Sequence, residues 1–507
     1  MVHRTVHHWP MSSDPPDPSP ATAGTAQLDA AVLGRRYADG SANAAGVVAE
    51  LLRRIEEVDR SGPTLRSVIS TNPDAEADAA ALDAGRAAGR VRGPLHGMPV
   101  LVKDNVDTEG AMGTTAGSLA LADAPPKADA VLVRRLREAG AIVLGKTNLS
   151  EWANFRSSTS SSGWSAAGGL CLNPYALDRS AGGSSSGSGA AVAAGLAPLA
   201  VGTETDGSIV CPAALNGVVG IKPTVGLVDG TGIVPISHSQ DTAGPLARTV
   251  SDAALLLGVL AGGDYTAHCQ ADRLRGARIG VPRQGLWGHS PRADALAEEA
   301  VRLLAARGAI IVDPADLPSM EELGGSDAEM TVLDTEFKVD LEAYLATRGP
   351  GAPRTLSELI AWNDAHADVE LVHFGQERFE LAVQTNGLAD LAYMRAREDC
   401  IRLGRTNGID AALAAHELDA LVAPTYPPAW KIDLTNGDQG TGGCPQPAAI
   451  AGYPLVTVPC GVTDGLPVGL TFMGTARSEP VLIGLAYAFE QALRLSITPA
   501  YRPPRAG

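Results

Sequence analysis

Lysine is rare in this sequence, and its scarcity draws attention to individual lysines. Of the 40 basic residues only six are lysine, so arginine carries most of the positive charge. The six are Lys103, Lys127, Lys146, Lys222, Lys338 and Lys431. Lys103 directly follows a short apolar run, where a solvent-facing lysine is not expected. We therefore expect Lys103 to have a chemical role.

Excess positive charge, aromatic residues and long apolar runs are also missing. The net charge is -17 at pH 7, which repels phosphate backbones and anionic lipid headgroups. Aromatic residues make up 4% of the chain, so few side chains are available for stacking on bases. No stretch approaches the length of apolar sequence that spans a membrane. Neither nucleic acid nor a membrane is an expected partner, and the oligomeric state is left open.

Cysteine pairs and targeting signals are absent as well. The six cysteines are widely spaced and form no C-x-x-C pair, so neither a zinc pattern nor a redox pair is predicted. The N-terminus lacks the apolar core of a secretory signal, and we expect a cytoplasmic protein. Residues 1–26 mix Pro, Ser, Asp and Ala without periodicity, which predicts a disordered leader.

The first half of the chain changes from a helical to a β-α-β pattern. With 45% hydrophobic and 19% charged residues, the chain is expected to be globular. The apolar spacing over residues 44–89 favours helices. The runs 98–102 and 141–144 are typical of buried strands, with a helix expected over 128–138.

The second half contains a long helical stretch followed by strands. Residues 264–418 are more charged and have helical spacing, whereas 421–423, 455–459 and 468–472 are short apolar runs. We therefore predict one α/β domain over residues 27–500, with a helical insertion at about 264–418.

Two stretches, residues 157–169 and 180–189, are too rich in Gly and Ser for a helix or strand interior. Trp164, Pro174 and Tyr175 interrupt this region, and regular elements flank it closely. A flexible linker would lack such residues, so we expect a packed, functional loop.

Two short motifs match known patterns but have the wrong context. Residues 140–147 satisfy G-x-x-x-x-G-K-T, yet the four variable positions are an apolar strand candidate and not a phosphate-binding loop. Residues 183–187 satisfy G-x-S-x-G with Ser185 at the centre, but no apolar strand precedes them. The last histidine is His416, so a Ser-His-Asp triad in hydrolase order is not expected.

Several longer motifs together resemble the amidase signature family, over roughly residues 30–500. The segments that carry the resemblance are PLHGMPVLVKDNVDT, GKTNLSEWANF, GGSSSGS, VGTETDGSIVCPAALNGVVGIKPT, APTYPPAW and AGYPLVTVPCG. The family pattern has two serines 24 positions apart, and Ser184 and Ser208 have this spacing. The resemblance implies an α/β fold with a large mixed central sheet flanked by helices.

The resemblance also implies a Ser-cisSer-Lys triad. Ser208 would be the nucleophile, Ser184 the serine after a cis peptide bond, and Lys103 the base. A desolvated, neutral lysine can activate a serine hydroxyl near neutral pH. Ser185 would hydrogen-bond and orient the lysine, although a loop serine that satisfies its own backbone is nearly as common.

The family's oxyanion loop corresponds to the segment before the nucleophile. Backbone N–H groups of Thr205, Asp206, Gly207 and Ser208 would bind the tetrahedral oxyanion. No cofactor and no metal is implied. Asp206 stands where many members have glycine, and a carboxylate there would oppose the oxyanion unless it points away or binds a substrate cation.

A second departure concerns the substrate. Val210 stands where many members have an arginine that could bind a carboxylate, so a small acidic substrate is not expected. The motifs most resemble the bacterial peptide amidase branch, which implies release of ammonia from C-terminal peptide amides through an acyl-enzyme on Ser208. The alternatives are a broad aliphatic or aryl amidase, a glutamine-hydrolysing subunit of a tRNA amidotransferase, and a non-catalytic amidase-like subunit. We expect pocket walls from residues 152–175 and 424–448.

Overall fold

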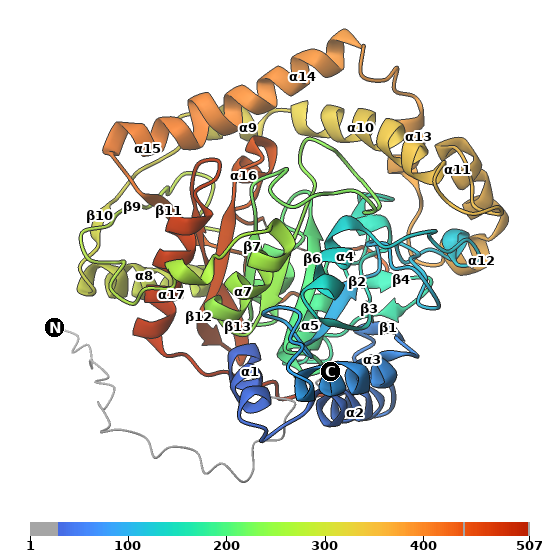
Figure 1. The fold of residues 1–507 in the computed structure, drawn as a ribbon. Helices are drawn as coiled ribbons and strands as arrows, with labels where there is room; N and C mark the ends of the chain where they lie inside the picture. The colour runs from blue at the N-terminus through green and yellow to red at the C-terminus, as the bar shows by residue number, and fades with distance from the viewer. Residues whose placement is uncertain (1–28, 440–441, 505–507) are drawn as a thin grey trace.

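A mixed sheet of 11 strands runs through the computed structural model, which describes residues 29–439 and 442–504 (Figure 1). The strand order is β1-β3-β2-β6-β8-β7-β12-β13-β11-β9-β10. These strands are β1 (Val68–Thr71), β2 (Pro99–Lys103), β3 (Ile142–Thr147), β6 (Leu199–Glu204), β7 (Val219–Lys222), β8 (Thr242–Ala247), β9 (Arg278–Gly280), β10 (Ile310–Val312), β11 (Ala420–Pro424), β12 (Leu455–Thr463) and β13 (Leu466–Met473). A separate small hairpin contains β4 (Trp164–Ser165) and β5 (Gly169–Leu170). The predicted α/β fold with a large mixed sheet is confirmed.

Seventeen α-helices of the described residues flank this sheet. They are α1 (Ala30–Ala38), α2 (Ala44–Arg54), α3 (Ala75–Ala87), α4 (Val131–Glu138), α5 (Ser186–Ala193), α6 (Val210–Leu215), α7 (Val250–Ala261), α8 (Pro291–Ala306), α9 (Met320–Gly324), α10 (Ala328–Leu345), α11 (Leu356–Ala365), α12 (Ala367–Glu370), α13 (Glu377–Val383), α14 (Leu391–Ile401), α15 (Asp410–His416), α16 (Gln446–Ala451) and α17 (Glu479–Leu493). Short 3-10 or π turns lie at η2 (Ile55–Ser61), η3 (Leu119–Leu121), η4 (Glu151–Asn154), η5 (Thr266–His268) and η6 (Arg402–Ile409).

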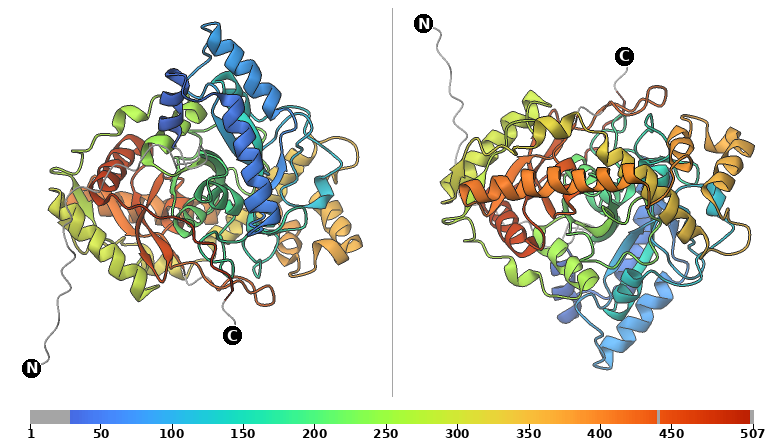
Figure 2. Two further views of the ribbon diagram at one scale, coloured as in Figure 1. Left: turned by 90° about the horizontal axis from the view of Figure 1, so that it is seen from below. Right: turned by 90° about the horizontal axis from the view of Figure 1, so that it is seen from above.

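The helices form layers at opposite ends of the view in Figure 1. Helices α10, α14 and α15 lie along the top, whereas α2 and α3 lie at the bottom. Figure 2 shows the same arrangement from below and from above, with each of these groups nearest the viewer in turn. None of the helices in the described ranges is long and apolar enough to span a membrane.

The centre of the sheet brings two buried strands side by side. Strands β2 and β6 are parallel neighbours, with Val102 opposite Val201 in register. Each is buried along its whole length. Because parallel strands end at the same edge of a sheet, the residues that finish β2 and β6 lie next to each other.

The expected strands are all present, but the sequence did not predict β1. The stretch 44–89, predicted to be helical, contains β1 between η2 and α3, so the prediction was wrong there. The four residues of β1 are VIST, and they pair antiparallel with β3 at the edge of the sheet. Helical spacing on both sides concealed this β-branched segment, whose conformation depends on its pairing with β3.

Three other expectations concern longer segments. The region 264–418 contains α8 to α15, but β9 and β10 within it extend the sheet, so it is not purely helical. Its description as an insertion in a single domain stays a prediction. The predicted leader, residues 1–26, lies outside the described residues. The Gly/Ser-rich region is packed as expected, since Trp164, Cys171 and Tyr175 are buried.

The false phosphate-loop motif lies inside the sheet. Its residues 142–147 form β3, and the Lys146 side chain is fully buried. Its Nζ donates to the carbonyl of Val106 at 2.7 Å and lies 3.4 Å from Asp104 Oδ1. Lys146 is therefore a buried, paired lysine and not a phosphate ligand.

Candidate active site

Lys103 is the last residue of β2, and its amine lies against the end of β6. The side chain is 0% exposed. Its Nζ donates to Thr203 Oγ1 at 2.8 Å and lies 3.3 Å from the Thr203 carbonyl oxygen. The pairing of β2 with β6 therefore positions the amine, as their shared edge implies.

Ser184 supplies the third partner of this amine. Lys103 Nζ lies 2.8 Å from Ser184 Oγ, and both side chains are fully buried. The Gly183–Ser184 peptide bond is cis, and Ser150 N donates to the Ser184 carbonyl at 3.1 Å. A Cβ atom at Gly183 would overlap the hydroxyls of Ser150 and Ser162. Glycine is therefore required beside Ser184 by close packing.

Ser185 does not make its expected hydrogen bond to Lys103. Its hydroxyl instead donates to the Thr203 carbonyl at 3.0 Å and accepts from Thr203 N at 3.1 Å. Ser185 thus holds Thr203, which in turn contacts the lysine. The sequence placed Ser185 in the right cluster but assigned it the wrong hydrogen-bond partner.

Ser208 lies in the turn between β6 and α6, close to the same cluster. It is 8% exposed, and its carbonyl accepts from Ser185 N at 3.1 Å. Its hydroxyl has no hydrogen-bond partner within residues 29–439 and 442–504, so the hydroxyls of Ser184 and Ser208 are not hydrogen-bonded to each other here. Such contacts commonly tighten only when substrate binds.

The environment of Lys103 favours its neutral form. Burial lowers its pKa from the usual value of 10.5 to about 7, although the nearby carboxylates of Asp241 and Glu204 act in the opposite direction. Desolvation is the larger effect, because an ammonium group loses its hydration in a buried site. A large fraction of the amine is therefore unprotonated near neutral pH.

Glu204 and Gly207 shape the turn that follows β6. The Glu204 carboxylate accepts from Ile209 N at 2.7 Å and Val210 N at 2.9 Å, and burial raises its pKa although Lys222 and the nearby backbone N–H groups act to lower it. Gly207 has a φ of +78°, and a Cβ there would lie 2.5 Å from Tyr426 Oη.

The N–H groups of the expected oxyanion loop differ in their surroundings. That of Gly207 lies near enough to the Glu204 carboxylate to lower its pKa. In the part of the chain that the structure describes, the N–H groups of Thr205, Asp206 and Ser208 have no acceptor, which leaves these three of the four expected donors available to a substrate oxygen.

Ser208 opens onto a cavity of about 390 Å³. The region 152–175 contributes Phe155 and Ser162, and the region 424–448 contributes Tyr426 and Trp430, as predicted. The remaining wall comes from residues that the sequence did not indicate: Ile236, Met330 and Leu333. Met330 and Leu333 lie on α10, whose approach to the site depends on the fold of the whole region.

The charges in this cavity are acidic. Its lining residues include Asp206 and Asp438 but no lysine or arginine. The Asp438 carboxylate accepts from Trp430 Nε1 at 3.0 Å and from Ser162 N at 3.1 Å. Among the lining residues, no side chain could form an ion pair with an anionic substrate.

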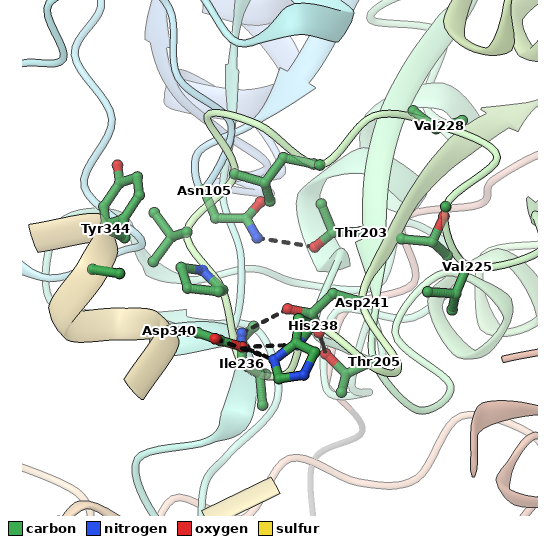
Figure 3. A pocket seen from close by; sticks show the side chains of 18 residues that line it. Asn105, Thr203, Thr205, Val225, Val228, Ile236, His238, Asp241, Asp340 and Tyr344 are labelled. Carbon is green, nitrogen blue, oxygen red and sulfur yellow. Dashed lines mark hydrogen bonds and ion pairs between the residues drawn. The ribbon is translucent and has the colours of Figure 1, made fainter. Parts of the chain in front are cut away.

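A second cavity, of about 380 Å³, is lined by Thr203, whose hydroxyl contacts Lys103 (Figure 3). Asn105 lines it and donates through Nδ2 to Thr203 Oγ1 at 2.9 Å. Asp241 also lines it and accepts from Thr205 Oγ1 at 2.6 Å. The two cavities share Thr205 and Ile236 in their walls. Asn105 thus supports Thr203, which contacts Lys103, from a side of the site that the sequence did not indicate.

Asn105, Thr203 and Asp241 were missed in the sequence. Asn105 follows Lys103 by two residues in VKDN, and Thr203 lies inside GTETDGS, so both were within segments already singled out. Asp241 lies far from both in sequence, and no spacing connects it with them.

One group of side chains in the described ranges has ligand atoms close enough for a metal ion. His238, Glu336 and Asp340 have such atoms within 4.8 Å of one another. His238 Nδ1 already lies 2.9 Å from Asp340 Oδ2 (Figure 3), and Glu336 accepts from the hydroxyls of Ser239 and Tyr393. This group is an ion-paired cluster whose atoms are already engaged.

Comparison with known proteins shows the family of this chain. The sequence profile of the Amidase family matches residues 46–483. The chain belongs to the amidase family. This amidase is also 39% identical to a probable amidase of Arabidopsis thaliana, over 88% of its own length and 87% of the relative's. It is therefore an amide-hydrolysing enzyme.

Two further relatives bear on the substrate of this amidase. The crystal structure of native peptide amidase from Stenotrophomonas maltophilia matches with a TM-score of 0.88 and 53% identity, over 94% of this chain and 98% of that one. One of the subunits of the glutamyl-tRNA(Gln) amidotransferase of Symbiobacterium thermophilum is 37% identical, over 92% of this chain and 97% of the relative.

Proposed function

We propose that this amidase removes the C-terminal amide of peptides and releases ammonia through an acyl-enzyme on Ser208. The observation that carries the proposal is the buried hydrogen bond of 2.8 Å between Lys103 Nζ and Ser184 Oγ, next to the cavity onto which Ser208 opens. A neutral amine bonded to a hydroxyl is the arrangement that a serine-activating base requires.

The first half of the reaction forms the acyl-enzyme. Lys103 Nζ accepts the proton of the Ser184 hydroxyl, and Ser184 takes the proton of Ser208 while Ser208 Oγ bonds to the amide carbon. The carbonyl double bond becomes an oxyanion, which backbone N–H groups of Thr205, Asp206 and Ser208 stabilise. Loss of one such donor typically costs about 3 to 4 kcal/mol of barrier.

The intermediate then collapses. The oxyanion re-forms the carbonyl as the C–N bond breaks, and Ser184 protonates the leaving nitrogen, which departs as ammonia while Lys103 returns a proton to Ser184. Water attacks the ester at Ser208 by the same relay, and the acid product leaves with regeneration of the three side chains.

The substrate proposal rests on the cavity and on similarity. The lining residues offer no cation for a substrate carboxylate and include two acidic groups, which favours neutral or cationic amides over acidic ones. The 53% identity with a peptide amidase favours peptide amides among them. A broad aliphatic or aryl amidase is the second candidate, because Phe155, Leu333 and Trp430 also line the cavity. The cytoplasm remains the compartment that the sequence predicts.

The decisive experiment measures ammonia released from dipeptide amides, acetamide, benzamide and glutamine by the wild-type chain. We expect dipeptide amides to have the highest kcat/KM. A preference for benzamide or acetamide would reject the peptide proposal and favour the broad amidase, and a preference for glutamine would favour the amidotransferase role.

Two substitutions test the proposed chemistry. Ser208→Ala and Lys103→Ala should each lower kcat by about 10³-fold or more, because nucleophile and base act as a unit. Thermal unfolding checks that both variants are folded. Turnover retained in folded Lys103→Ala would contradict a lysine base.

A further inference from the structure

The carboxyl group of Asp206 has no role in the proton relay, yet it lines the catalytic cavity. Asp206 precedes Ser208 by two residues and belongs to the wall of the same cavity of about 390 Å³. During attack the amide carbon must come within about 3 to 3.5 Å of Ser208 Oγ. Side chains on the same turn are therefore the ones that reach the other atoms bonded to that carbon.

The hydrogen-bonding state of this carboxyl group is unusual. Neither oxygen of Asp206 has a hydrogen-bond partner within the described ranges, and Oδ1 is fully enclosed. Buried polar atoms in proteins almost always have a partner. Oδ2 also lacks a partner but is not enclosed, so it is the oxygen of this cavity-lining residue that a donor arriving with the substrate can reach.

The neighbouring carboxyl groups differ because their hydrogen bonds are made within the protein. Glu329 accepts from Gln240 Nε2 at 3.0 Å and from Gln446 Nε2 at 2.9 Å. Glu204 accepts through Oε2 from the backbone of the following turn, and neither Glu204 nor Glu329 lines the cavity. Asp206 is thus the carboxyl group next to Ser208 that both lines the cavity and lacks a partner.

We propose that the Asp206 carboxyl group binds the –NH2 of the substrate carboxamide, and that this contact makes the enzyme selective for primary amides over esters. The inference rests on the proposed amide hydrolysis and deepens it. A primary amide offers two N–H donors, one of which can reach Asp206. An ester offers none, and the carboxylate product also offers none, so this contact holds the substrate but not the product.

The charge of Asp206 is compatible with this role. Burial raises its pKa well above the usual value, and the nearby Glu329 and Glu204 raise it further. These effects favour the neutral form, and in either form a carboxyl oxygen accepts a hydrogen bond. The neutral form also avoids the full negative charge that would oppose the oxyanion.

The test compares a primary amide with the methyl ester of the same acyl group. We expect Asp206→Ala to lower the amide-to-ester ratio of kcat/KM by about tenfold or more. Asp206→Asn keeps a carbonyl oxygen at this position and should restore the ratio to within about threefold of wild type. Equal losses for amide and ester in Asp206→Ala, or no restoration by Asp206→Asn, would overturn the proposal.

Asp438→Asn is the matched control. It alters the other acidic residue of the cavity wall, whose oxygens already have protein partners, and it should affect amide and ester alike. A selective loss on amides in this variant would also count against the assignment to Asp206.

The comparison is made with whichever primary amide the wild type hydrolyses. Failure of the peptide proposal, seen as a preference for benzamide, is therefore distinct from failure of the Asp206 proposal, seen in the ratio.

Discussion

Three of the six lysines are fully buried, so neither scarcity nor burial alone identifies a base. Lys146 lies 3.4 Å from Asp104, and Lys222 donates to a backbone carbonyl. Lys103 differs because its amine lies beside the hydroxyl of Ser184. The partners of a buried lysine, which depend on the fold, decide between a structural and a chemical role.

The pH profile tests the state of Lys103. With a pKa lowered to about 7 by burial, the amine gains protons as pH falls through that value and can no longer accept one from Ser184. We expect kcat/KM to rise with pH through about 7 and to level off above it, with about a tenfold fall per pH unit on the acid side. A profile that stays flat from pH 5 to pH 8 would contradict the proposed base.

Thr203 is a positioning residue whose hydroxyl accepts from Lys103. Thr203→Val removes that acceptor but keeps the shape, and we expect kcat to fall about tenfold or more. The acid limb should also move to lower pH, because the ammonium form loses a hydrogen bond that stabilises it. Steady-state kinetics across pH measure both effects.

Thr335→Val is the control for this substitution. Its hydroxyl donates to the Thr331 carbonyl within α10, so it should change stability without moving the acid limb. If the acid limb of the pH profile does not move in Thr203→Val, the role of Thr203 is structural only.

At the scale of elements, the turn between β6 and α6 shapes the site. Among the described residues, its N–H groups at Thr205, Asp206 and Ser208 have no acceptor, and Gly207 within it takes a left-handed conformation close to Tyr426. The sequence predicted the oxyanion loop by resemblance, whereas the close approach of Tyr426 to Gly207 is seen only in the structure.

Gly207→Ala should therefore lose activity by about tenfold or more. The left-handed conformation costs an L-residue about 1 to 2 kcal/mol, and the new Cβ would lie 2.5 Å from Tyr426 Oη, which displaces the turn. Ammonia release and thermal unfolding are measured on the same preparation.

Gly262→Ala provides the comparison. Gly262 ends α7 with a φ of +81°, and a Cβ there would meet nothing within 4 Å. It should lose a similar amount of stability and keep full activity. Equal activity losses in both variants would show that the effect at Gly207 is general destabilisation.

At the scale of the whole molecule, one chain brings all parts of the site together. Residues of β2, β6, α10 and the Gly/Ser-rich region meet at one edge of the sheet. The related amidotransferase chain is by name one part of a larger enzyme, which makes the activity of this chain alone informative.

We expect the purified chain by itself to release ammonia from dipeptide amides. Each proposed catalytic group, Lys103, Ser184 and Ser208, is present in it, and the bond between Lys103 and Ser184 is made within the one chain. An ammonia assay on the isolated chain, with Ser208→Ala as the blank, measures this. Activity that requires an added protein fraction would favour one component of a larger assembly.

The sequence alone determined that buried strands lie near the site, and its resemblance to a family predicted the serine and lysine cluster. The apolar run 98–102 must be buried, and the motif that follows it begins with Lys103. Such local patterns are readable because burial and backbone preference act over a few residues. The same local patterns also predicted the α/β fold, although they did not predict the edge strand β1.

Only the tertiary structure decided which atoms meet. Lys103 contacts Thr203 across 100 positions of sequence and Ser184 across 81, and Ser185 bonds to Thr203 and not to the lysine. The pKa of Lys103 and the open hydrogen-bonding capacity of Asp206 follow from the same packing. The desolvation of a group and its hydrogen-bond partners depend on the residues that folding brings around it. The spacing of residues along the chain does not specify them.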